Sequence, residues 1–193
     1  MIYQALKKYS NWKVILSLLI LTLLFMTVVF PHYEAKINKA ANEKVRILDA
    51  RFSYNLEQVN SLFDKMGSEG RGVYRFIAAN VDMVYPIVYG LFFILSIASF
   101  LKKIFPARPK TMLVALIPLI AVLFDYLENF NTLKMLGNFP NITPDEVAKG
   151  ALFTQLKWEF IVISIFLILI LAAAAGIRKL LLKANHDKAK DRD

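Results

Sequence analysis

The chain contains no cysteine and only two histidines among its 193 residues. Without cysteine there are no disulfides, no thiolate nucleophile and no metal site built on cysteine. Neither His32 nor His186 lies near the acidic and aromatic residues that are discussed below as a candidate site. Histidine, the commonest general base and metal ligand, is therefore missing from that site. Histidine-zinc lipid hydrolases and thiol-dependent quinone reductases are therefore disfavoured.

Charge is nearly missing from four long stretches, residues 14–30, 83–101, 112–127 and 160–176. Each stretch is near the lower end of the length that crosses ~30 Å of hydrocarbon. A soluble chain of this size would have to bury four almost uncharged helices, which is more apolar surface than one modest domain hides. The sequence therefore predicts an all-α polytopic membrane protein, with four transmembrane helices in an antiparallel bundle that forms a single membrane domain.

The basic residues are distributed unevenly between the connecting segments. The N-terminal segment, the 102–110 loop and the tail 177–193 together hold 13 Lys and Arg against 3 acids. The rest of the chain, which includes the loops 31–82 and 128–159, holds the remaining 11 against 12. By the positive-inside rule, we expect both termini on the cytoplasmic side of a bacterial inner membrane, with both longer loops outside. The basic tail would rest against anionic lipid headgroups, and its lack of interleaved aromatics disfavours nucleic-acid binding.

Helix signals in the two outward loops predict an amphipathic helical cap. Apolar residues recur at helical spacing through the first loop. There Asn55-x-x-Gln58 is typical of a helix start, and Gly67 is typical of a helix end. In the second loop a Thr143 cap with Glu146 three residues later predicts a helix that continues into the fourth span.

Polar residues on the second span share one helical face. Spacings of 3, 4, 4, 3 and 4 connect Arg71, Tyr74, Ala78, Asp82, Tyr85 and Tyr89. Pro86 lies within this stripe and cannot donate to the carbonyl of Asp82, so that oxygen should be free for another ligand. Placing an acid such as Asp82 among apolar neighbours in a membrane is costly and indicates a site.

The third span ends in a second polar face, formed by Asp125, Glu128 and Asn129 at positions i, i+3 and i+4. Antiparallel packing would bring this face level with Asp82. The candidate catalytic residues are therefore Asp82, Asp125 and Glu128. The candidate substrate-binding residues are Arg71, Tyr74, Tyr85, Tyr89, Asn129, Trp158 and Glu159. An oxygen-only site for Mg²⁺ or Ca²⁺ is a further possibility, and no cofactor is otherwise indicated.

Each of these residues also has a structural explanation. The tyrosines and Trp158 are typical of the aromatic belt at a membrane interface. Asp125 and Glu128 are also compatible with a helix that simply ends in headgroup water. Arg71 paired with an acid would act as a structural clamp.

The segments Asp82-x-x-Tyr85-Pro86 and Asp125-x-x-Glu128-Asn129, with Gly70-Arg71-x-x-Tyr74 before them, resemble a group of small uncharacterised bacterial four-span membrane proteins. The resemblance covers about residues 60–130. The group has no activity that we can name, so the resemblance implies a fold and no mechanism.

Two classes of function remain open from the sequence. In the first, an outward pocket binds a lipid or isoprenoid-like amphiphile with its tail along Phe92, Phe93 and Leu95, and closely placed carboxyls act as acid and base. In the second, the protein is a non-catalytic accessory or scaffold subunit whose acidic face pairs with a cation of a membrane-protein partner. Homo-oligomerisation is compatible with both, and the sequence does not decide whether the protein is an enzyme.

Overall fold

The computed structural model describes residues 2–106 and 109–190 and is 88% helical, with no strand in those ranges. The elements are α1 (Ile2–Tyr9), α2 (Trp12–Leu24), η1 (Phe25–Val29), α3 (Phe30–Ala41), η2 (Leu48–Ala50), α4 (Leu56–Phe76), η3 (Ile77–Val81), α5 (Asp82–Ile104), η4 (Pro109–Leu116), α6 (Pro118–Asn138) and α7 (Pro144–Lys190). The all-α class expected from the sequence is confirmed.

Four continuous helical stretches are long and apolar enough to cross a membrane, which indicates a multi-pass membrane protein. They are Trp12–Ala41, Leu56–Ile104, Lys110–Asn138 and Pro144–Ala184. Each contains one of the apolar runs found in the sequence. The first continues well past residue 30 and ends where Asn42 adopts a left-handed conformation with φ 53°.

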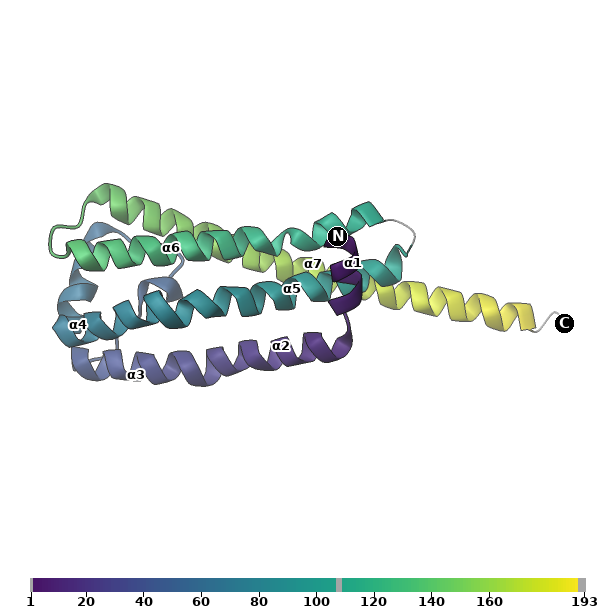
Figure 1. Ribbon diagram of the computed structural model, residues 1–193, viewed down its shortest axis with the longest axis horizontal. Helices are drawn as coiled ribbons and strands as arrows, with labels where there is room; N and C mark the ends of the chain where they lie inside the picture. The colour runs from purple at the N-terminus through teal and green to yellow at the C-terminus, as the bar shows by residue number, and fades with distance from the viewer. Residues whose placement is uncertain (1, 107–108, 191–193) are drawn as a thin grey trace.

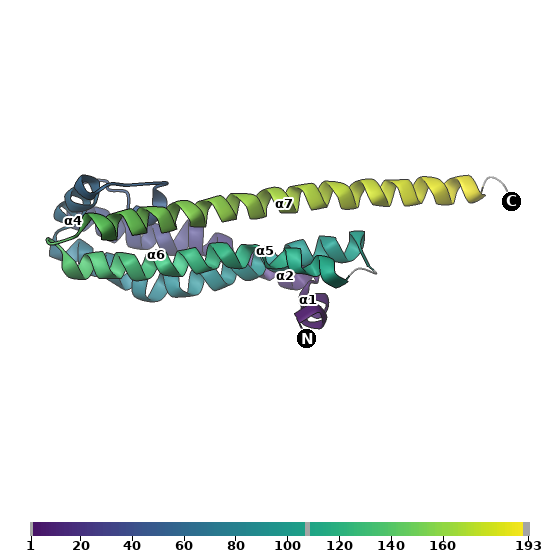
Figure 2. The ribbon, with the colours of Figure 1, turned by 90° about the horizontal axis from the view of Figure 1, so that it is seen from above.

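The long helices lie side by side, and α5 is the central one (Figure 1). It contacts α2, α6 and α7, while α3 packs along α4 and α6 packs along α7. Both termini lie toward one end of the molecule, and α7 extends beyond the other helices at that end (Figures 1 and 2). We call the opposite end, where the α3–α4 and α6–α7 connections lie, the distal end.

The helices differ in how much of their apolar surface the protein covers. In the most apolar window of the Leu56–Ile104 stretch 61% of the residues are buried, against 6% in the Trp12–Ala41 stretch and 11% in the Pro144–Ala184 stretch. Exposed side chains on the two less buried stretches include Ile20, Met26, Phe166 and Ile170. Apolar surface of this extent is stable only against lipid or another apolar partner.

Local sequence explains where the helices begin and bend. Asn55 and Gln58 form a reciprocal capping box at the start of α4. Gly67, at φ 60° and ψ −174°, breaks that helix at the position expected from the sequence, because glycine adopts this conformation without a Cβ penalty. The expected start of the last helix is confirmed as well, since Thr143 and Glu146 bond each other's backbone N–H groups at 3.3 and 3.1 Å.

Pro118 does not interrupt a helix. It stands at the first turn of α6, after the 3₁₀ segment Pro109–Leu116. A proline has no N–H to donate and its ring clashes with the carbonyl four residues earlier, so the first turn is the position where it fits an α-helix.

Candidate functional site

Three carboxyl groups and one lysine meet between α5, α6 and α7 in the distal half of the molecule. Asp82 is 6% exposed, Asp125 2%, Glu128 0% and Lys157 5%. The Lys157 ammonium forms an ion pair with Glu128 Oε2, and it lies 4.0 Å from Asp125 Oδ1. All three candidate catalytic residues are therefore buried in the protein interior, and we call them, with Lys157, the charge cluster.

Lys157 is the central member of this cluster, and the sequence analysis missed it. It directly precedes Trp158 and Glu159, so it looked like part of an interfacial helix start. The sequence did indicate that Lys157 could face inward, because helical spacing places it on one stripe of α7 with three small residues, Gly150, Thr154 and Ser164. All four are buried, and this stripe faces the other helices.

Thr154 and Tyr54 extend the cluster toward the distal end. The Thr154 hydroxyl donates to Glu128 Oε1 at 2.6 Å, and the Tyr54 hydroxyl lies 3.4 Å from Thr154 Oγ1. Burial of the Tyr54 ring raises the pKa of its hydroxyl above the usual value, and the nearby Glu128 charge adds to this. Tyr54 therefore stays protonated and can act as a hydrogen-bond donor.

Asn129 connects the two aspartates. Its side-chain amide donates to the backbone carbonyl of Asp82 at 2.9 Å and approaches Asp125 Oδ1 at 3.4 Å. The Asp82 carbonyl is the one that Pro86 cannot bond, so the side-chain amide takes the place of the missing backbone donor. The second oxygen of Asp125 accepts a hydrogen bond from the Tyr89 hydroxyl at 2.8 Å. Asp82 and Tyr89 of the first polar face thus converge with Asp125 and Asn129 of the second.

The Asp82 carboxyl group itself has no hydrogen bond or ion pair with any residue that the structure describes. On α6, the buried oxygens Asn129 Oδ1 and Thr132 Oγ1 also lack a hydrogen-bond partner among the described residues. Buried polar atoms are nearly always paired, and an unpaired one requires a specific explanation. Asp82 is accordingly the member of the cluster best placed to bind an additional proton or ligand atom.

Arg71 and Tyr74 do not join the cluster. Arg71 donates to the Phe63 carbonyl at 2.7 Å and covers the Phe139 ring at 4.7 Å. It pairs with no acid among the described residues, so the suggested clamp is not observed there. Tyr74 is fully buried and donates to Asp49 Oδ2 at 2.7 Å. Tyr74 holds the α3–α4 connection onto α4, because Asp49 lies in that connection. Arg71 instead connects α4 with Phe139, the residue that follows α6.

Tyr85 belongs to an aromatic cluster that joins the first span to α5. Its ring centroid lies 5.4 Å from Phe25, 5.0 Å from Phe30 and 5.2 Å from Tyr89. Such ring pairs stabilise a fold beyond their burial alone. Tyr85 therefore contacts the site through Tyr89, and its own hydroxyl makes no hydrogen bond in the described ranges.

Trp158 and Glu159 line an apolar groove of about 450 Å³ on the outer side of α7. Phe52, Val162 and Ile163 complete its walls. The Trp158 indole N–H donates to the Asp49 carbonyl at 3.1 Å, which holds the ring against the α3–α4 connection. The Lys157 ammonium lies 5.7 Å from the centre of the same ring, so Trp158 stands between the groove and the charge cluster.

The described residues contain no group of three or more His, Cys, Asp or Glu side chains arranged to hold a metal ion. The cluster instead neutralises part of its charge with Lys157. Comparison with known proteins adds no functional information, since no family model, curated protein or solved structure matches the chain. Function must therefore be argued from the groove and the cluster.

Proposed function

We propose that the protein binds a lipid or isoprenoid-like amphiphile in the groove on α7, beside a charge cluster that exchanges protons with the bound head group. We place it in a bacterial inner membrane as four antiparallel spans, with both termini cytoplasmic and the distal end outside. The uneven distribution of Lys and Arg supports this orientation. In this orientation, the helices and loops of the distal end form the amphipathic cap expected from the sequence.

The groove is the observation that carries the proposal. Its volume of about 450 Å³ falls within the ~300–1,000 Å³ typical of small-molecule sites. Phe52, Val162 and Ile163 offer apolar surface for a chain, and Glu159 is the one charged group in the lining. Because Val162 is 45% exposed and Ile163 also 45%, an acyl or isoprenyl chain can reach them directly from the bilayer.

This route differs from the tail path expected from the sequence. Phe93 and Leu95 are 9% and 6% exposed and pack inside the bundle, so they leave no room for a chain. The groove on α7 offers an apolar surface at the level of the cluster, because it begins at the residue after Lys157. The amphiphile is therefore proposed to lie along Val162 and Ile163, with its head toward Glu159 and Trp158.

The charge cluster provides the acid–base chemistry of the proposal. Three ionised carboxylates and one ammonium would leave an excess negative charge in a space closed from water, which is costly unless protons or counter-charges reduce it. Closely placed carboxyls with different partners differ in proton affinity, so one serves as acid while another serves as base. Isomerisation or cyclisation of the amphiphile, which needs proton transfer but no water, fits this arrangement, with Asp82, Asp125 and Glu128 as the exchanging groups.

Val162→Trp tests the binding step, since the larger ring fills the groove without altering the cluster. We expect lipid extracts of the parent protein, purified in mild detergent, to contain one amphiphile per chain by mass spectrometry, and those of Val162→Trp to lack it. Ile170→Trp is the matched control, because Ile170 is exposed on the same helix and does not line the groove. Equal lipid content in all three proteins would contradict the proposal.

A scaffold function is the second candidate, in a form that differs from the sequence expectation, because the acidic face pairs with a cation of its own chain and not with one of a partner. Lys157 belongs to the same chain as the acids it pairs with, so the cluster is a closed element that holds α6 against α7. On this hypothesis the cluster only stabilises the fold. A stoichiometric membrane protein that co-purifies in place of a lipid would support the scaffold.

A further inference from the structure

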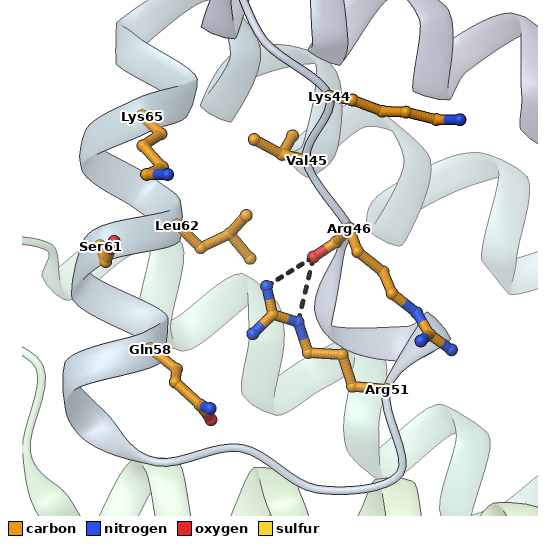
Figure 3. Close-up of a pocket in the computed structure, with 8 residues that line it drawn as sticks. All are labelled: Lys44, Val45, Arg46, Arg51, Gln58, Ser61, Leu62 and Lys65. Carbon is orange, nitrogen blue, oxygen red and sulfur yellow. Dashed lines mark hydrogen bonds between the residues drawn. The ribbon is translucent and has the colours of Figure 1, made fainter.

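A second pocket, of about 210 Å³, lies between the α3–α4 connection and the first turns of α4. Figure 3 shows its eight lining residues, which are Lys44, Val45, Arg46, Arg51, Gln58, Ser61, Leu62 and Lys65. Four of the eight are basic and none is acidic. This concentration is local, because the segments outside the three basic ones hold 11 Lys and Arg against 12 acids.

Arg51 is held in place at the centre of this basic pocket. Its Nε and Nη2 atoms donate to the Arg46 carbonyl at 3.1 and 2.9 Å. Figure 3 shows its guanidinium turned toward Leu62, between the connection and α4. A guanidinium carries five N–H donors, so donors remain for a ligand after these two bonds. Because the side chain is already ordered, a bound anion would not have to bear the full entropic cost of ordering it.

The other polar groups divide into two sets. Lys65, Gln58 and Ser61 lie on α4 across from Arg51, and Lys65 is the only one in an ion pair, with Glu43 at 2.9 Å. Figure 3 shows the side chains of Lys44 and Arg46 extending away from Leu62. Arg51 and the α4 residues therefore supply the direct donors, while Lys44 and Arg46 contribute positive potential.

We propose that this basic pocket binds a phosphate group. A planar guanidinium pairs bidentately with phosphate oxygens, and lysine adds a point charge. The volume of about 210 Å³ lies below the usual range for drug-sized ligands and suits a small anionic head. The phosphate comes from an anionic lipid headgroup or from free phosphate in solution. This site does not depend on the amphiphile groove proposed above.

Two measurements on the full chain in maltoside micelles distinguish these sources. In the first, phosphatidylglycerol is added and the lipid retained per chain is counted by native mass spectrometry. In the second, inorganic phosphate is titrated at constant ionic strength and the shift in melting temperature is recorded. We expect saturable binding of at least one of the two probes, and which of them binds identifies the source.

Arg51→Gln and Lys65→Gln should each weaken this binding about ten-fold or more, because a charge-assisted hydrogen bond to the anion is lost. Lys149→Gln is the matched control for Lys65→Gln. Lys149 is exposed and paired with Asp145, as Lys65 is exposed and paired with Glu43. Both substitutions therefore remove one basic charge and one surface ion pair.

The proposal is overturned if neither probe binds saturably, or if Lys149→Gln weakens binding as much as Lys65→Gln does. The latter result would mean that net charge alone attracts the anion. Lys65 is itself exposed, so Lys65→Gln should fold even if Arg51→Gln does not.

Discussion

Lys157→Met gives the most direct test of the charge cluster. The substitution removes the ammonium and keeps most of the side-chain volume. Glu128, which is 0% exposed, then loses its ion-pair partner, and Asp125 loses a positive charge 4.0 Å away. Breaking a buried pair from one side costs about 3–5 kcal/mol, since a buried charge is left uncompensated. In a chain of this size, each kcal/mol of lost stability lowers the melting temperature by about 2–4 °C, so we expect a decrease of ~6–20 °C.

A double-mutant cycle separates the pair from the individual side chains. Glu128→Gln keeps the size of the side chain and can still accept the hydrogen bond from Thr154. We expect Lys157→Met combined with Glu128→Gln to be more stable than the sum of the two single losses predicts, because neither charge is then buried alone. Thermal unfolding in detergent, followed by circular dichroism at fixed protein concentration, measures all four proteins.

The exposed pair Lys149–Asp145 provides the control. Lys149→Met removes an ion pair between side chains that are 59% and 70% exposed, for which a cost of under about 1 kcal/mol is expected. The view that Lys157 neutralises the buried carboxylates is refuted by either of two results. The first is that Lys157→Met lowers the free energy of unfolding no more than Lys149→Met does. The second is that the stability losses of Lys157→Met and Glu128→Gln simply add in the double variant.

Three further predictions concern the site, its packing and the topology. Asp82→Asn should retain the parent melting temperature and lose any turnover of the bound amphiphile, because no described hydrogen bond or ion pair depends on the Asp82 carboxyl; a large loss of stability would favour a scaffold. Gly150→Ala should destabilise the protein by about 1–3 kcal/mol in the same melting assay, since the new Cβ would lie 2.5 Å from the Tyr54 hydroxyl. Cysteine introduced at Pro106 should be protected from an impermeant thiol reagent in intact cells, whereas cysteine at Asn141 should react; the reverse labelling would overturn the proposed orientation.

The polar face of the third span could be predicted from the sequence because it lies on a single helix. Asp125, Glu128 and Asn129 are neighbours through helical periodicity alone, and burial of all three followed once that helix packed. The freed carbonyl at Asp82 was likewise a local consequence of Pro86. Its actual partner, the amide of Asn129, comes from a different helix, and no local rule identifies it.

Arg71 and Lys157 show the opposite case. By helical spacing Arg71 shares a stripe with Asp82, but it lies between the break at Gly67 and the π-helical segment Ile77–Val81. There its guanidinium donates to the Phe63 carbonyl and covers the Phe139 ring. Lys157 lies beside interfacial residues in the sequence, yet the rotation of α7 turns it inward. Adjacent residues on a helix differ by about 100° in direction, so neighbours in sequence face different surroundings.

The sequence by itself determined the helical class, the four apolar stretches and the main helix starts, because hydrophobic length, charge and capping act within one segment. The tertiary structure decided which cation neutralises the carboxyls, which carboxyl remains unpaired, and where an apolar groove and a basic pocket form. These features depend on the rotation of each helix about its axis and on how the α3–α4 connection packs. Both are set by contacts between segments that are distant in the sequence.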